Sequence, residues 1–309
     1  MERPYILHMF TPKAWMSPFD VNMAADAGYQ TIVPYCGIGL GDVAGLTQDA
    51  IFSRGPKGVA RTGLFIGGRD ALQAQDMLDA ARQAMVPPFV VSVMADPSGA
   101  YTTAAALVAC VEAQLKKHHG QPLAGQRVVL LGGTGPVGAV AAVLAAQEGA
   151  QVLISSHRDQ ARAQAAADAL NARFGAQFRT PIQGVFGADA AAVQASLADA
   201  GVVMGVAAAG VQVLSAEVRD ACPNLRVAAD INAVPPAGIA GVGVMDNGQP
   251  IASNPASNSA VGIGALAIGN VKYQVQHRLL KRMCSGEKAV NLSFPEAFQL
   301  AREVLAESA

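Results

Sequence analysis

Short apolar runs alternate with segments of helical periodicity through the first hundred residues. The runs at 5–9, 31–34, 64–66 and 90–94 predict buried strands, and helices are expected near 20–27, 42–54 and 70–84. Each of these helices is expected to begin with an aspartate N-cap, at Asp20, Asp42 and Asp70. Strands that alternate with helices in this way predict a mostly parallel sheet covered on both faces.

A second alternating series follows a turn at 96–99 and a helix at 103–118, which Thr102 or Thr103 would cap and Gly120 would end. Its strands are expected at 127–131, 151–154, 202–206 and 226–229, with helices at 137–147, 160–174 and 190–198, and one from 215. Two more helices, at 268–283 and 295–307, complete the pattern. The sequence therefore predicts an α/β protein of two domains. Residues 1–120 form an N-terminal α/β domain, and residues 121–309 form a Rossmann-type domain with a doubly wound parallel sheet, whose C-terminal helices pack back on the first domain.

A glycine fingerprint follows the strand at 127–131. Its spacing, Gly133-x-Gly135-x-x-Gly138, is that of a dinucleotide-binding turn, with Pro136 near the first helical position, where its missing N–H costs little. The alternative is an ordinary strand-to-helix turn, which its position between an apolar strand and an apolar helix disfavours. The residues expected to hold the cofactor phosphates are Gly133, Thr134, Gly135, Pro136 and Val137.

The acid that normally binds the adenosine ribose, about 20 residues beyond such a turn, is missing. The strand at 151–154 ends instead in Ser155, Ser156, His157 and Arg158, and Asp159 is expected to cap the next helix. A carboxylate would repel the 2′-phosphate of NADP, whereas the guanidinium of Arg158 suits it. We therefore expect Ser156, His157 and Arg158 to bind the cofactor, and NADP to be preferred over NAD, which can also bind.

Composition narrows the class of protein. Of the 309 residues, 51% are hydrophobic and 15% charged, as expected for a multilayer α/β protein, and a formal net charge of -1 argues against nucleic acid as a partner. Apolar runs are interrupted before the roughly 18 residues that a membrane span needs, and 1–4 lacks the apolar core of a signal peptide. These two observations predict a cytoplasmic protein. The four cysteines show no ligand spacing, so we expect no metal site.

The usual proton-transfer groups of alcohol dehydrogenases are not found. None of the five tyrosines has a lysine four residues later, and each histidine is better explained as structural or as facing the nucleotide. A hydride transfer that needs no proton acceptor fits this inventory best.

Four polar clusters, at 17–20, 96–103, 230–236 and 262–265, fall at predicted strand ends or helix starts. The carboxyl ends of strands in a doubly wound sheet face the ligand crevice, so these clusters could bind ligands. Capping and turn formation explain each cluster, taken singly, equally well.

Long strings of the sequence resemble one enzyme family. The segments at 16–24, 46–54, 61–68, 232–241 and 261–274 are similar to the NAD(P)-dependent methylene-tetrahydromethanopterin dehydrogenases of methylotrophic bacteria. The resemblance covers nearly the whole chain. It is closer to the branch devoted to the methanopterin carrier than to the strictly NADP-dependent branch that also takes the folate carrier.

This resemblance implies that a methylene bridge on a reduced pterin is oxidised to a methenyl group, with hydride passing to the nicotinamide, in one-carbon metabolism. It implies Lys272 as the polar residue at the pterin, although a solvated helix lysine is the alternative. Asp20, Asp96, Thr102 and Thr103 would bind the pterin in a cleft between the domains, and Asn232 would border the nicotinamide. The family further suggests a homo-oligomer such as a trimer. Two rival functions stay open: methylene-tetrahydrofolate dehydrogenase, and a nucleotide-binding regulator without turnover.

Overall fold

The chain divides into two compact units, each with its own sheet. The computed structural model describes residues 3–251, 260–285 and 288–307, so Met1 and Glu2 of the amino-terminal segment lie outside the described residues. Unit 1 comprises Met1–Thr102 and Tyr273–Leu300, and unit 2 comprises Thr103–Lys272 and Ala301–Ala309. The division falls inside helix α5 (Ala100–Gln114), whereas the sequence placed it after residue 120. In unit 2, Arg302 explains part of this difference because it donates to Glu112 of α5 at 2.7 Å and pairs with Glu148 at 2.7 Å.

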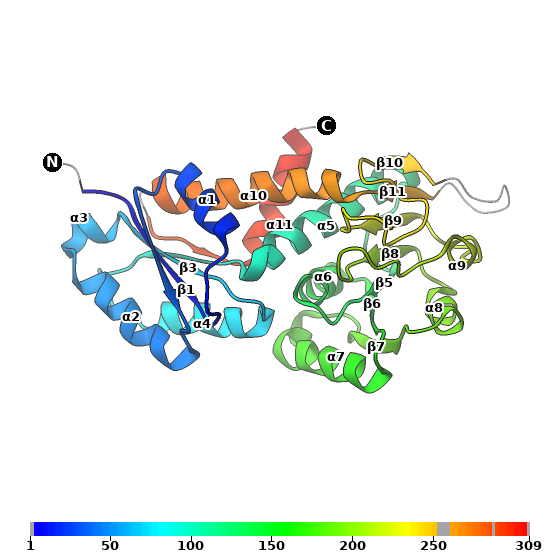
Figure 1. Ribbon diagram of the computed structural model, residues 1–309, viewed down its shortest axis with the longest axis horizontal. Helices are drawn as coiled ribbons and strands as arrows, with labels where there is room; N and C mark the ends of the chain where they lie inside the picture. The colour runs from blue at the N-terminus through cyan, green and yellow to red at the C-terminus, as the bar shows by residue number, and fades with distance from the viewer. Residues whose placement is uncertain (1–2, 252–259, 286–287, 308–309) are drawn as a thin grey trace. The chain divides into compact units, whose positions relative to one another are not determined.

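Unit 1 is built on five parallel strands in the order β12-β4-β3-β1-β2. The strands are β1 (Ile6–Thr11), β2 (Thr31–Cys36), β3 (Thr62–Ile66), β4 (Ser92–Ala95) and β12 (Asn291–Leu292). The helices of this unit are α1 (Pro18–Asp26), α2 (Leu40–Phe52), α3 (Gly55–Val59) and α4 (Ala71–Gln83), joined by parts of α10 (Ala265–Ser285) and α11 (Phe294–Glu307). Helices α1 and α10 lie on one face of the sheet and α2 and α4 on the other (Figure 1). The direction of winding therefore reverses between β1 and β3.

Unit 2 has a seven-stranded sheet in the order β10-β11-β9-β8-β5-β6-β7, in which only β10 is antiparallel among the described strands. Its strands are β5 (Arg127–Leu131), β6 (Gln151–Ser156), β7 (Gln183–Phe186), β8 (Val202–Gly205), β9 (Val227–Asp230), β10 (Asn247–Pro250) and β11 (Val261–Ile263). The helices are α6 (Pro136–Gln147), α7 (Gln160–Phe174), α8 (Ala190–Leu197) and α9 (Ala216–Asp220). Strands β7, β6, β5, β8, β9 and β11 reproduce the Rossmann order, which confirms the predicted fold class.

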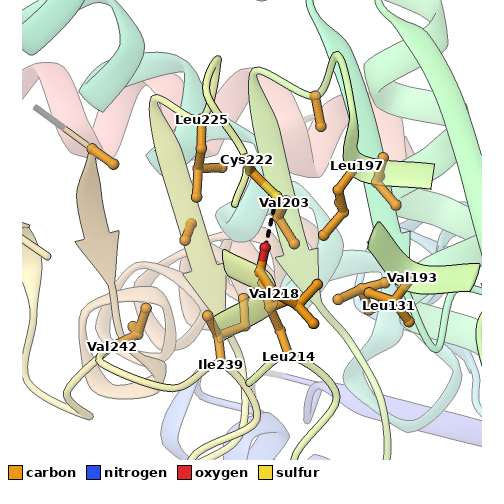
Figure 2. Close-up of a cluster of buried hydrophobic side chains, with 14 of the residues drawn as sticks. Leu131, Val193, Leu197, Val203, Leu214, Val218, Cys222, Leu225, Ile239 and Val242 are labelled. Atoms are coloured by element: carbon orange, nitrogen blue, oxygen red, sulfur yellow. Dashed lines mark hydrogen bonds between the residues drawn. The ribbon is translucent and has the colours of Figure 1, made fainter. Parts of the chain in front are cut away.

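The core of unit 2 includes a layer of buried aliphatic side chains beneath α8 and α9. Leu197, Val203 and Ile239 are fully buried there, and the Cys222 thiol donates to the Val218 carbonyl at 3.1 Å (Figure 2). Burial raises the pKa of this thiol to about 11, so it packs as a small apolar group and is not a reactive thiolate.

Two of the four aspartates predicted to be helix N-caps are N-caps in the structure, and two are not. Asp70 and Asp159 accept from the backbone N–H groups three residues ahead, as expected of N-caps. Asp20 and Asp42 are instead the third residues of α1 and α2, so their prediction as N-caps was wrong. Pro18, which favours the first helical position, starts α1 two residues earlier than predicted, and Asp42 accepts from the Gly39 N–H, which forms the cap of α2.

Three short helical segments complete the described elements: Pro97–Gly99 and Gly175–Gln177 are 3₁₀ turns, and Leu115–His119 is a π-helical continuation of α5. Gly120, with φ of 61°, ends that continuation as predicted. Within the described ranges, none of the helices combines the length and apolarity needed to cross a bilayer. The same ranges contain no group of three or more His, Cys, Asp or Glu side chains suited to a metal ion.

Candidate active site

A cavity of about 310 Å³ lies in unit 1, at the carboxyl ends of β1, β3 and β4. It is lined by Thr11, Lys13, Trp15, Met16, Ser17, Pro18, Asp20, Gly68, Arg69 and Ser98. The position is significant because β1 and β3 flank the point where the winding reverses, and ligands of doubly wound sheets bind outside the strand ends at that point.

Asp20 is the buried acid of this cavity. Only 2% of its surface is exposed, and its Oδ1 accepts from Nε2 of Gln276 at 2.8 Å. Gln276 lies on α10 and is fully buried, so the bond joins α1 to a helix 256 positions further along the chain. A carboxylate held in this way has a fixed direction and can accept N–H groups of a ligand.

Gln276 was not predicted from the sequence. An amide within a helix gives no local signal of a buried partner. The only hint in the sequence was the spacing of Gln276 from Lys272. Lys272 lies four residues earlier on α10, so the two side chains occupy one face of the helix. Lys272 itself is half-buried.

Asp96 and Thr102 are also buried, but the described contacts are within their own segment. The Asp96 carboxylate accepts from the backbone N–H groups of Tyr101 at 2.9 Å and Thr102 at 3.2 Å, and from the Thr102 hydroxyl at 2.7 Å. Asp96, and not Thr102 or Thr103 as predicted, therefore caps the start of α5. Thr103 is half-buried on the next position of that helix. The described cavity lining includes Asp20 but not Asp96, Thr102 or Thr103, whose contact with a pterin stays a prediction.

We expect Asp96→Ala to lower the free energy of unfolding by about 1–3 kcal/mol, because buried donors at the start of α5 lose their acceptor. Asp96→Asn should lose less, since an amide keeps one acceptor oxygen. Urea unfolding measures both changes. Asp26→Ala, at an exposed position of the same unit, is the control, and equal midpoints for Asp96→Ala and Asp26→Ala would contradict the capping role.

The glycine turn of unit 2 has the geometry of its fingerprint. A Cβ atom on Gly138 would lie 2.6 Å from the Gly133 Cα, and one on Gly133 would lie 2.9 Å from the Ile154 Cβ, so both positions demand glycine. Gly135 is the N-cap of α6 and has no neighbour closer than 3.9 Å to its Cβ position, and Pro136 is the first helical residue. Thr134, Pro136 and Val137 are half-buried, so the helix N-terminus is accessible for an anion.

The polar residues at the end of β6 divide into a buried pair of serines and an exposed histidine and arginine. Ser155 and Ser156 are each 2% exposed and serve the backbone, since the Ser155 Oγ accepts from Gly132 N–H and the Ser156 Oγ accepts from Arg158 N–H, both at 3.2 Å. His157 and Arg158 are exposed. Asp159 is engaged as the cap of α7, with its Oδ1 2.6 Å from the Arg162 nitrogen. The exposed groups available to a nucleotide at this strand end are therefore an imidazole and a guanidinium.

Asn232 follows β9 and organises the loop after it. Its Oδ1 accepts from the N–H groups of Val234 and Gly210, and its Nδ2 donates to the Pro236 carbonyl at 2.8 Å. Asp230, which belongs to the polar cluster at 230–236 but was given no role of its own, accepts from Asn232 N–H at 2.9 Å and Ile239 N–H at 3.0 Å. Burial raises the pKa of Asp230, and these N–H bonds oppose that effect. Both residues fix the loop, and contact of Asn232 with the nicotinamide stays a prediction.

The Rossmann strand order and the glycine turn place the chain in the class of two-unit α/β proteins with a dinucleotide-binding fold. Solved structures agree on the fold. The 5-ketofructose reductase of a Gluconobacter strain aligns with a TM-score of 0.51 at 17% identity over 98% of this chain and 99% of that one. Shikimate 5-dehydrogenase of Listeria monocytogenes aligns with a TM-score of 0.52 at 11% identity over 98% and 96%.

Sequence relatives define the family. The chain is 48% identical to the NAD(P)-dependent methylenetetrahydromethanopterin dehydrogenase of Methylorubrum extorquens, over 97% of this chain and 98% of the relative. It is 32% identical, with the same coverage, to the bifunctional protein MdtA of that organism. The family model of the methylene-tetrahydromethanopterin dehydrogenase N-terminal region matches residues 18–98. The chain belongs to the methylenetetrahydromethanopterin dehydrogenase family.

Proposed function

We propose that this protein oxidises methylene-tetrahydromethanopterin to the methenyl form by transferring a hydride to NADP, or to NAD. The observation that carries the proposal is the buried Asp20, which lines a cavity at the β1/β3 switch point and is held by a hydrogen bond from Gln276. A tetrahydropterin ring presents adjacent N–H donors, which a fixed carboxylate accepts well. The close relative named as such a dehydrogenase supports the same assignment.

The chemistry explains why no general base is required. Loss of hydride leaves a methenyl carbon whose positive charge is delocalised over two nitrogens, so no proton has to be removed. Rate then depends on holding the one-carbon bridge in position and on the field around it. We assign Asp20 to the pterin ring and Lys272 to the pterin near the reacting carbon. Asp96, Thr102 and Thr103 complete the substrate residues, with Asp96 and Thr102 also shaping the start of α5.

The nucleotide would be held by unit 2. The turn from Gly133 to Val137 would take the pyrophosphate at the N-terminus of α6, as dinucleotide folds do. When bound, the nicotinamide supplies the hydride acceptor. His157 and Arg158 would lie at the adenosine ribose, and Ser156 would take part in this site by holding the Arg158 backbone. Asn232 would border the nicotinamide through the loop that it fixes.

We predict that NADP is preferred over NAD and that Arg158→Ala reduces this preference. Arg158 is exposed beside His157, and a guanidinium bonded to the 2′-phosphate contributes about 1.5–3 kcal/mol, or a factor of about ten or more. The measurement is kcat/KM for each coenzyme in the wild type and the variant. Arg162→Ala, which alters an exposed arginine one turn into α7, is the control. A wild type that prefers NAD, or a variant with undiminished NADP preference, would show that Arg158 does not read the phosphate.

An assay of nicotinamide reduction with each one-carbon carrier tests the function itself. We expect turnover with methylene-tetrahydromethanopterin and a much lower kcat/KM with methylene-tetrahydrofolate. The reverse order would make the protein a folate enzyme. Absence of turnover with either carrier, in a protein that binds NADP, would support a regulator.

The coenzyme indicates where the protein works. We propose that the protein is cytoplasmic, because the cytoplasm holds the NADP and NAD that dehydrogenases use. We also propose a homo-oligomer such as a trimer, which light scattering after size exclusion would measure directly.

A further inference from the structure

The rim of the unit 1 cavity carries an exposed tryptophan. Trp15 is the only tryptophan of the chain, and 63% of its surface is exposed although it lines the cavity. Large aromatic side chains contribute most when they are buried, so an indole exposed at the edge of a cavity gains contact area when a ligand fills that cavity.

The backbone that carries Trp15 is held firmly. The Lys13 carbonyl accepts from Gly37 N–H at 2.9 Å, and the Thr11 carbonyl accepts from Ile38 N–H at 3.0 Å. Met16 is buried beneath the loop, with its sulfur 3.1 Å from the place of a Cβ on Gly67. Since Met16 turns inward and the loop is tied to the chain after β2, Trp15 is presented outward from a fixed base.

The opposite rim is equally fixed. Ser98 has φ of 54°, the single positive value among the described residues other than glycine, and its hydroxyl donates to the Gly68 carbonyl at 2.7 Å. A conformation of this kind persists only where surrounding contacts enforce it, and such residues cluster at ligand sites. The cavity is thus a preformed slot between the loop after β1 and the loops after β3 and β4.

The buried and the exposed residues that line the slot differ in chemistry. The acid Asp20 and the side chains of Thr11 and Met16 are buried at its floor, whereas Lys13, Trp15 and Arg69 are exposed at its rim. A tetrahydropterin ring bound to Asp20 would therefore leave the remainder of the carrier at a rim with one aromatic and two cationic side chains.

We propose that the Trp15 indole stacks on the aryl ring of the one-carbon carrier and so selects tetrahydropterins that bear an arylamine. This inference rests on the proposed function. The bridge that is oxidised joins a ring nitrogen of the pterin to the nitrogen of an arylamine, so the aryl ring must lie directly beyond the reacting carbon. With the pterin ring bound to Asp20, the aryl ring would lie toward the rim, where the indole offers it an offset-stacked contact.

The single tryptophan provides the measurement. Quenching of its fluorescence gives the Kd of tetrahydromethanopterin, and 6-methyltetrahydropterin, which has no aryl ring, serves as the competing probe. Trp15→Ala loses the fluorescent signal, so its Kd for each probe comes from calorimetry, and kcat and KM from the coenzyme assay.

We expect Trp15→Ala to weaken tetrahydromethanopterin binding about tenfold, as the loss of an aromatic pair predicts, with Kd for 6-methyltetrahydropterin unchanged. Trp15→Phe should restore much of the affinity because it keeps an aromatic face. Phe52→Ala, which removes an aromatic side chain of 54% exposure outside the cavity lining, should change neither Kd.

Three results would overturn the inference: an unchanged Kd for tetrahydromethanopterin in Trp15→Ala, equal losses for both probes, or an altered oligomer size with unchanged affinity. The last would make the indole a contact between subunits. Failure of the proposed function is separate, since it appears as absent turnover in the wild type, whereas the ratio of the two Kd values tests Trp15 with or without turnover.

Discussion

Lys272→Ala should lower kcat by about two orders of magnitude while leaving the Kd of NADP nearly unchanged. Hydride loss leaves a positive charge on the pterin, which an ammonium does not stabilise, so we expect Lys272 to act by holding the pterin in position. Misplacement of reacting groups by about 1 Å costs a factor of about 10² in rate. We place Lys272 at the pterin because it lies one helical turn before Gln276, which binds Asp20. Steady-state kinetics with both substrates, and NADP binding by calorimetry, give the two quantities.

The matched control is Lys281→Ala, at an exposed position of the same helix, which should keep the kcat of the wild type. Lys272→Arg should recover part of the rate if charge alone matters, and little if the compact ammonium is required. A rise in KM for the pterin with kcat intact would mean that Lys272 binds ground state and transition state equally. Wild-type turnover in Lys272→Ala would remove the residue from the site.

The fold could be predicted from local patterns because each buried parallel strand is a run of apolar residues. The run at 127–131 matches β5 residue for residue, and the periodic segment at 160–174 matches α7. Strands β7, β10, β11 and β12 were missed for physical reasons. Gln183–Phe186 and Val261–Ile263 are short and each contains a glycine, so neither gives a clear apolar run. Asn247–Pro250 is an antiparallel edge strand with two polar residues and a proline, and Asn291–Leu292 has only two residues, so neither shows an apolar period.

The candidate site was harder to predict because ligand contacts and turn formation use the same residue types. Asp96 shows this well: a buried aspartate at a strand end was expected to bind the pterin, and the structure engages both of its oxygens at the start of α5. Asp159 was assigned to its helix because the following segment required a cap, and that prediction was correct. The cap requirement could therefore be predicted at the starts of α4 and α7, but not at α1 and α2, where the predicted caps were wrong.

Long-range partners had no such signal. The bond between Gln276 and Asp20 depends on how α10 packs on α1, and neither residue differs locally from a surface amide or a first-turn acid. Trp15 could be seen in the sequence, but its position at a cavity rim needed the three loops that follow β1, β3 and β4. The residues on which the site depends most were thus the ones that only tertiary structure brings together.

Gln276→Leu should reduce kcat/KM for the pterin by about ten- to a hundredfold, because the carboxylate of Asp20 loses a donor that fixes its direction. A hydrogen bond to a charged group contributes about 1.5–3 kcal/mol, and each 1.4 kcal/mol is a factor of ten. Gln274→Leu, two positions earlier and half-buried, is the control. Unchanged kinetics in Gln276→Leu would show that Asp20 needs no support from α10.

Gln276→Glu tests whether this support is the bond itself. It sets two carboxyl groups in contact, and such neighbours cannot both ionise, so the pKa of one is raised. Below that raised pKa the shared proton restores an O–H···O bond, and activity should return; as the pH rises through it, the proton is lost and activity should fall. Gln276→Leu has no proton to lose and should show a uniform deficit in activity across the same pH range.

The double variant Asp20→Asn with Gln276→Glu reverses donor and acceptor. If it regains the stability of the wild type but not its kcat/KM, the bond positions Asp20 and the Asp20 carboxylate itself serves the substrate; if it regains both, the charge of Asp20 is dispensable and our assignment of Asp20 to the pterin ring is wrong.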